Sequence, residues 1–294
     1  MNDVYGVDPR SATDFLTFAS LMHRFETGQG RFIADFPKGW YQDLRTHVKS
    51  MSSIERIKAE ELWLMVGKNA VVPSEARFNL MKSWTENAHA LTGQVVKLVG
   101  PSGSEKPIEP LDVVLTDPDG FPDARGGHIP RTPAAYAKAA RPLLQTSPKV
   151  VLVDQYFKLR YWDKHREQFR RSWRHWKSLS ALLVEAVKWD RVEVFRLMVS
   201  SEDALFGDPD GEIFDSDLMD LAAECGVAGK IQLELGFLDP GSAVDSHPRY
   251  LLGMNSGLHF DWGFDTGDAD STNHIEWMGR SVLKPLLERF TGPA

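Results

Sequence analysis

Cysteine is almost absent from this chain, whose 294 residues include a single example, Cys225. No disulfide can therefore form within the chain, and a structural zinc site built from several cysteines is excluded. A low cysteine content is typical of proteins from a reducing compartment, so we expect this protein to be cytoplasmic.

Long apolar runs are also lacking. Val150–Val153, one of the longest, has the length of a strand, far below the roughly 18 apolar residues that cross a bilayer. Residues 1–10 contain no basic stretch followed by an apolar stretch. The sequence therefore predicts neither a signal peptide nor a membrane partner.

Three common catalytic signatures are missing: the glycine-rich phosphate loop ending in Lys-Ser or Lys-Thr, the Gly-x-Ser-x-Gly elbow and the His-Glu-x-x-His zinc motif. Near the carboxyl end, candidate metal ligands gather without any fixed spacing: Asp261, Asp265, Asp268, Asp270 and His274. A metal hydrolase site is one interpretation of this group, and a solvated acidic loop is the one we favour. The sequence thus predicts no metal and no cofactor.

The residues that are present suit a folded core. Hydrophobic residues make up 42% of the chain and aromatic residues 11%, which argues against disorder, and the length suits two modest domains. The formal net charge of −7 argues against general binding to DNA. A local basic patch can still override an acidic average.

The first half, residues 1–146, is expected to be a mainly helical region with a short strand pair. Apolar residues recur at helical spacing over residues 11–93, whereas the apolar runs at 95–99 and 111–115 favour strands. The other expected elements of this half are a loop at 30–37, a loop at 116–133 and a helix at 133–145.

The second half, residues 147–294, alternates strands and helices. Val150–Val153 is a continuous apolar run, as in strands buried on both faces, and Asn255-Ser256-Gly257 is a hairpin turn signal. The expected β-α-β-α-β-β-β-α order has segments near 150–153, 162–188, 192–199, 215–226, 230–237, 249–254, 258–262 and 273–290. The predicted fold class is α+β or α/β, with a helical amino-terminal region followed by a sheet flanked by helices.

Two groups of residues could form an active site in this half. Asp154 directly follows the strand ending at Val153, where α/β sheets line their ligand crevices; a structural strand-end cap is the alternative. His247 and Arg249 are separated by one residue, so in a strand both side chains point to the same face. A proton-transferring or nucleophilic histidine beside a phosphate-holding arginine suits phosphoryl chemistry. The alternative is a loop-bonded histidine with a surface arginine.

A basic and aromatic stretch follows Asp154. Its cations, opposed only by Asp163 and Glu167, are Lys158, Arg160, Lys164, Arg166, Arg170, Arg171, Arg174 and Lys177. Its interleaved rings are Tyr156, Tyr161, Trp162, Trp173 and Trp176. Cations that contact phosphates and rings that stack on bases would bind nucleic acid. The alternative is an amphipathic helix with its rings on the sheet and its charges in solvent, and the two interpretations are compatible.

Residues 148–291 resemble half of a phospholipase D-like fold. The resemblance is carried by Val153–Phe157, His247–Leu252, Gly257–Asp265 and the closing amphipathic helix. It is strongest to the divergent single-motif branch, which includes the C-terminal domain of microtubule-interacting-and-transport proteins and bacterial proteins, some of them tied to phage defence.

The resemblance implies a metal-independent phosphodiesterase or nuclease-like protein of antiviral defence. Active members of the family attack phosphodiesters through a histidine nucleophile, often in a site shared by two copies, so a homodimer is expected. By resemblance, His247 is the nucleophile and Arg249 takes the place of the family's lysine. Asp154 and Tyr156 would orient these groups. The substrate-binding track would consist of Lys158, Arg160, Arg170 and Arg174.

The sequence also departs from the family's catalytic motif. Arg249 stands where the motif has lysine, Met254 stands where it has aspartate, and no second copy of the motif is present. These departures leave a second hypothesis open, in which the domain is an inactive scaffold. Such a scaffold would bind nucleic acid or a partner protein without cleaving anything.

Overall fold

The computed structural model describes residues 3–25, 27–47, 51–117, 120–121, 124–163, 165, 168–200, 212–238, 249–268 and 270–291. The chain divides into two compact units, Met1–Arg125 and Gly126–Ala294. The division comes before the expected boundary at residue 146 because helix α7 (Pro133–Thr146) packs on helix α8 (Trp173–Trp189) of the second unit.

The first unit contains a five-stranded parallel sheet in the order β3-β2-β1-β4-β5. Its strands are β1 (Asp3–Val7), β2 (Arg31–Asp35), β3 (Val71–Pro73), β4 (Lys97–Gly100) and β5 (Ile108–Pro110). The prediction of a single strand pair is therefore wrong. Residues 30–37, expected as a loop, contain β2, and residues 111–115, expected as a strand, lie in helix α6 (Leu111–Thr116).

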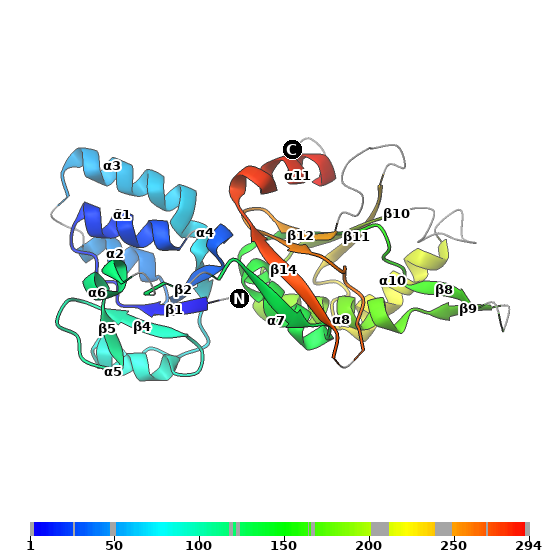
Figure 1. Ribbon diagram of the computed structural model, residues 1–294, viewed down its shortest axis with the longest axis horizontal. Coiled ribbons are helices and arrows are strands. Elements are labelled where there is room, and N and C mark those ends of the chain that lie inside the picture. The colour runs from blue at the N-terminus through cyan, green and yellow to red at the C-terminus, as the bar shows by residue number, and fades with distance from the viewer. Residues whose placement is uncertain are drawn as a thin grey trace. The chain divides into compact units, whose positions relative to one another are not determined.

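Helices cover both faces of this sheet (Figure 1). One face carries α1 (Phe15–Arg24), α2 (Trp40–His47) and α3 (Ser53–Leu62), and the other carries α5 (Trp84–Ala88). Short helical segments complete the unit: η1 (Thr27–Gln29), η2 (Trp63–Gly67), α4 (Lys68–Ala70) and η3 (His89–Leu91).

Capping residues set where two of these helices begin. The side chain of Ser52 accepts from the backbone N–H of Glu55, and the Glu55 side chain accepts from the backbone N–H of Ser52, so α3 begins at Ser53. Helical spacing extends over residues 11–93, but α5 begins only at Trp84, where Ser83 and Glu86 form the same reciprocal cap. The second capping box, rather than the apolar pattern, decided the start of α5.

The second unit contains a seven-stranded mixed sheet in the order β11-β10-β7-β12-β13-β14-β6. Its parallel part is β7 (Lys149–Asp154), β10 (Val194–Ser200) and β11 (Gln232–Leu238). Its antiparallel part is β12 (Arg249–Gly253), β13 (Gly257–Phe260), β14 (Thr272–Met278) and β6 (Gly126–Pro130). The mixed α/β class with helix-flanked sheets is confirmed.

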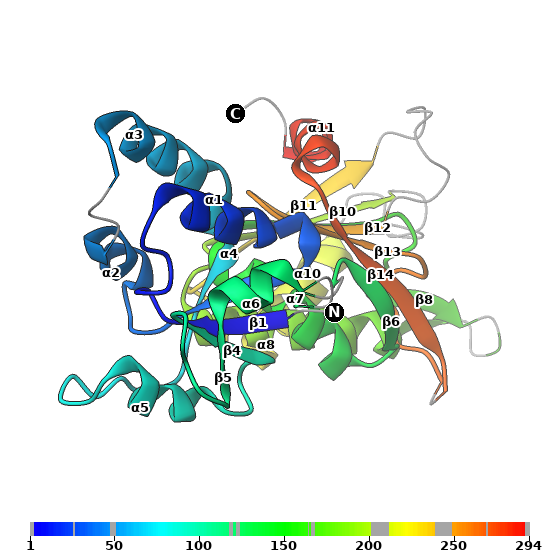
Figure 2. The same cartoon turned by 60° about the vertical axis from the view of Figure 1, so that its left-hand side comes forward.

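Helices lie on both faces of this sheet as well. Figures 1 and 2 show α7, α8 and α10 (Glu212–Glu224) on one side and α11 (Arg280–Thr291) on the other. Val151 and Val153 of β7 pack with Leu283 and Phe290 of α11. Val150 and Leu152 point to the opposite face and are also fully buried. The continuous apolar run of β7 thus has the cause that the sequence predicts, burial on both faces.

Three elements of this unit differ from the sequence prediction. β14 occupies the first part of the helix expected at 273–290, and the helix itself begins only at Arg280. β6 lies in the region expected as a loop and pairs with β14. The helix expected from residue 162 begins at Trp173, because the hairpin of β8 (Arg160–Asp163) and β9 (Gln168–Arg171) precedes it.

Membrane spans were sought among the described helices. None of them is both long enough and apolar enough to cross a bilayer.

Candidate functional site

Asp154 and Arg249 face each other as a register pair between the antiparallel strands β7 and β12. The buried Asp154 carboxylate accepts the backbone N–H of Tyr156 at 3.0 Å and that of Phe264 at 3.1 Å. Burial raises the pKa of Asp154 to about 6, against the lowering effects of these N–H groups and of Arg249. The carboxylate therefore ties the end of β7 to the segment that follows β13.

Arg249 is held in place by two contacts besides its pairing with Asp154. Its Nη1 donates to the backbone carbonyl of Asp261, and its guanidinium carbon lies 5.3 Å from the centre of the Tyr156 ring. Its Nε is buried and has no hydrogen-bond partner among the described residues. Because Nε is enclosed by the protein, an incoming anion could reach only the Nη groups of this fixed guanidinium, whose N–H donors can bond a phosphate oxygen.

Gly263 lets the chain pass close to this pair. Its φ is +79°, and a Cβ built on it would lie 2.6 Å from Asp154 Oδ2. Only glycine adopts this backbone conformation without strain, and only glycine leaves room for the carboxylate. The Gly263–Phe264 turn is therefore shaped around Asp154.

Gly263→Ala is expected to destabilise the fold by about 2 kcal/mol or more. The left-handed conformation alone costs an L-residue about 1–2 kcal/mol, and the methyl group would also displace the Asp154 carboxylate from the Phe264 N–H. Urea unfolding measures the change. Gly127→Ala is the matched control, since a Cβ at Gly127 meets nothing within 4 Å. Equal stability of the two variants would contradict the account.

A polar network also holds residues 263–265 in place. Asn273 donates to the carbonyl of Gly263 at 2.9 Å, and the Tyr136 hydroxyl donates to the carbonyl of Asp265 at 3.0 Å. The Asp265 carboxylate accepts from Arg131 Nη2, and its other oxygen lies 4.0 Å from Arg174 Nη1. Arg131 Nε, like Arg249 Nε, is buried without a partner among the described residues.

His175 lies next to this network and is a residue that the sequence analysis missed. Burial lowers its pKa to about 4, so the imidazole is neutral near pH 7. Its charged neighbours are Asp265, Lys158, Arg174 and Arg131. The missed signal is the spacing from Ser172, the N-cap residue of α8, whose hydroxyl lies 3.2 Å from His175 Nδ1. A helix that began at residue 162, as expected, would place Ser172 in its interior, so the spacing between Ser172 and His175 would not mark a helix start.

The predicted substrate-binding cations occupy different surroundings. Arg160 forms a bidentate pair with Asp217 of α10, with Nη2 2.6 Å from Oδ1 and Nε on the other carboxylate oxygen. Arg174 reaches Asp268 at 3.5 Å. Lys158 is close enough to lower the pKa of His175. His247, the predicted nucleophile, lies outside the described residues.

Arg170 lines a pocket of about 410 Å³ on the β8–β9 hairpin, together with Tyr161, Gln168, Arg171 and Trp173. Trp173 is 57% exposed, whereas Trp176 is buried and donates to Glu224 at 3.0 Å. The Arg171 guanidinium lies 3.7 Å from the centre of the Trp176 ring and 5.4 Å from that of Trp173. The amphipathic interpretation of this stretch is thus confirmed in part, with one ring inside and one outside, and nucleic-acid binding stays a prediction.

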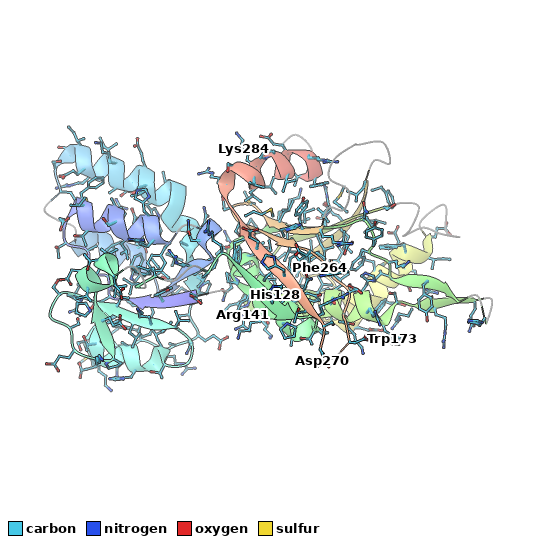
Figure 3. The ribbon with its side chains drawn as sticks, viewed as in Figure 1. His128, Arg141, Trp173, Phe264, Asp270 and Lys284 are labelled. Atoms are coloured by element: carbon cyan, nitrogen blue, oxygen red, sulfur yellow. The ribbon has the colours of Figure 1, made fainter. Side chains whose placement is uncertain are left out.

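The first turn of α8 joins the hairpin pocket to the polar network. Trp173, labelled in Figure 3 with Phe264 of the turn, lines the pocket. Arg174 faces Asp265, and His175 points inward to the ring of Phe157 with 4.9 Å between ring centres. Three consecutive residues therefore serve the pocket, the network and the core.

One of the acidic residues near the carboxyl end, Asp261, lies close to two histidines on the antiparallel part of the sheet, and a third histidine packs on one of them. Asp261 lies 3.6 Å from Nδ1 of both His259 and His274, and the rings of His274 and His128 have centres 5.1 Å apart. Within the described ranges, no three histidine, cysteine or acidic side chains are placed to hold a metal ion.

Comparison with protein-family models and with curated proteins finds no match. Among solved structures, the chain is similar to TrmBL2, an archaeal chromatin protein described as showing a novel mode of DNA binding. The identity is 16% and the TM-score 0.30, over 85% of this chain and 67% of that one. A score this low carries no argument about fold or function.

Proposed function

We propose that the second unit is a phospholipase D-like domain that binds the phosphodiester backbone of nucleic acid at the carboxyl end of β7. His247 would act there as the nucleophile of a metal-independent cleavage. The observation that carries the proposal is the Arg249 guanidinium, fixed beside Asp154 and above Tyr156 at the carboxyl end of β7. The same residues carry the resemblance in the sequence.

The charge around the turn supports binding of an anion. Arg131, Arg174 and Lys158 lie near His175. Asp265 contacts both arginines, and Asp268 also lies 3.5 Å from Arg174. A neutral His175 adds no positive charge, and its Nδ1 already lies 3.2 Å from the Ser172 hydroxyl. Arginine and lysine side chains attract phosphate oxygens, so these three cations support binding of an anion.

The hairpin pocket supports nucleic acid as the source of that phosphate. Tyr161 is 42% exposed and Trp173 57%, and Arg170 and Arg171 line the same pocket. Bases stack on exposed rings, while neighbouring arginines contact the backbone of the strand. A role in bacterial antiphage defence is part of the proposal, because proteins that the sequence resembles include defence proteins.

An inactive scaffold is the second candidate, and the contacts of Arg249 favour it. In a catalytic site the family's lysine meets the substrate as a point charge, whereas Nη1 of Arg249 is already bound to the Asp261 carbonyl. Met254, in place of aspartate, supplies no orienting carboxylate. Such a scaffold would bind nucleic acid or a partner protein through the same surface without cleavage.

The test compares wild type with His247→Ala and Arg249→Ala, with EDTA present throughout. The substrates are bis-p-nitrophenyl phosphate, single- and double-stranded DNA, and RNA. We expect the histidine variant to lose cleavage, and the arginine variant to bind nucleic acid about tenfold more weakly, or ~1.4 kcal/mol. Arg280→Ala, an exposed arginine of α11, is the control.

The outcomes separate the two candidates. Binding without cleavage, unchanged in His247→Ala but weakened in Arg249→Ala, supports the scaffold. Absence of both binding and cleavage rejects the nucleic-acid proposal and leaves a protein partner. Sedimentation of the same samples tests the expected homodimer, since a site shared by two copies needs one.

A further inference from the structure

A pocket of about 390 Å³ lies in the first unit, between α1, α2 and α3. Its volume is in the range of small-molecule sites. One wall is apolar and consists of Phe18, Leu44, Met51, Ile57 and Ala59. Ile57 is 61% exposed although it lines the pocket, so an apolar ligand would remove its side chain from water.

The acidic residue of the pocket is already neutralised. Glu60 Oε1 lies 2.7 Å from Arg45 Nη2, and Glu60 Oε2 accepts the Tyr41 hydroxyl at 3.1 Å. The Tyr41 ring is stacked on Trp63 with 3.5 Å between ring centres and an angle of 3°. This cluster forms a rigid polar edge with no net charge.

Arg56 is the remaining charge of the pocket. Its Nε donates to the carbonyl of Met51 at 3.1 Å, which fixes the guanidinium, and no described carboxylate pairs with it. The two Nη groups are left for a ligand. A single guanidinium matches one planar carboxylate, which accepts two parallel N–H bonds and balances its charge. A phosphate dianion would need a second cation, and Arg45 is bound to Glu60.

We propose that this pocket binds an amphipathic carboxylate, with its apolar chain against Phe18, Leu44 and Ile57 and its carboxylate on the Nη groups of Arg56. The pocket belongs to the first compact unit, whereas the proposed phosphodiester site belongs to the second. The two proposals therefore rest on different residues and fail separately.

The experiment is calorimetric titration of the full-length chain with octanoate, octan-1-ol and octylamine. We expect octanoate to bind, and the alcohol and the amine to bind at least tenfold more weakly. Arg56→Met should weaken octanoate about tenfold. Lys58→Met removes an exposed positive charge from the same helix without touching the pocket, and should change nothing. Ala59→Leu, which fills the pocket, should block binding.

Three results would overturn the proposal: no binding of octanoate, equal binding of all three probes, or octanoate binding that Arg56→Met leaves unchanged. Arg56 and Lys58 are both exposed on α3, so neither substitution is expected to impair folding. Circular dichroism checks this for every variant. If Ala59→Leu does not fold, the pair of Arg56 and Lys58 variants decides alone.

Discussion

Arg160→Ala is expected to destabilise the fold by about 3 kcal/mol, because it leaves a buried carboxylate without its partner. The Asp217 side chain is 1% exposed, and Arg160 contacts both of its oxygens. Breaking a buried pair from one side costs about 3–5 kcal/mol. We expect the lower end of that range, since Arg160 itself is 39% exposed and water screens part of the interaction.

Urea unfolding of the full-length chain at pH 7 measures this loss. Lys177→Ala, an exposed cation of α8, is the control and should stay within about 0.5 kcal/mol of wild type. The double variant Arg160→Met with Asp217→Asn should recover part of the loss, because it leaves no buried charge. If Arg160→Ala kept wild-type stability but lost nucleic-acid binding, the predicted substrate-binding role of Arg160 would replace the structural one.

Asp154→Ala is expected to cost about 3 kcal/mol at pH 5, because the backbone N–H groups of Tyr156 and Phe264 lose their acceptor inside the protein. Each unsatisfied buried donor costs about 1–3 kcal/mol. The carboxylate also accepts the N–H of Phe264 in the turn that begins at Gly263, which packs against Arg249. Removing the carboxylate should therefore also shift the Arg249 side chain. Asp220→Ala, an exposed aspartate of α10, is the control.

The cost of Asp154→Ala should fall as the pH rises. Burial raises the pKa of Asp154 from 3.8 to about 6, so the folded state favours the protonated carboxyl. That stabilisation is fully present below the unfolded pKa of 3.8 and is lost as the pH rises through 6. Between pH 5 and pH 8 the difference between wild type and variant should shrink by roughly 1 kcal/mol. A stability difference between wild type and Asp154→Ala that grows as the pH rises would contradict this predicted direction.

Local pattern was enough to predict several elements of the second unit. The apolar run of β7, the turn at Asn255-Ser256-Gly257 between β12 and β13, and the start of α7 at Pro133 are confirmed. Each of these depends on residues close together in the chain, such as a run of β-branched side chains or a residue that favours a turn. The position of Asp154 at the end of β7 followed from the same run.

Pairing between distant segments could not be predicted from these patterns. β6 and β14 become strands because each completes the other's hydrogen bonds at the edge of the sheet, and neither has a strong apolar run. In the first unit, short strands buried between helices on both faces lose the alternation that marks a strand. The β8–β9 hairpin is anchored by Arg160 to Asp217, which lies 57 residues along the chain.

The sequence by itself determined the candidate residues. These are Asp154 at the end of the first strand of the second half, His247 and Arg249, and the basic and aromatic stretch that follows Asp154. Only the tertiary structure decided which of them meet. The antiparallel pairing of β7 with β12 sets Asp154 opposite Arg249, and the packing of α8 turns Arg174 toward Asp265 and His175 toward the core. Side chains so far apart in the chain are brought together by burial of the sheet, because that burial fixes the register of its strands.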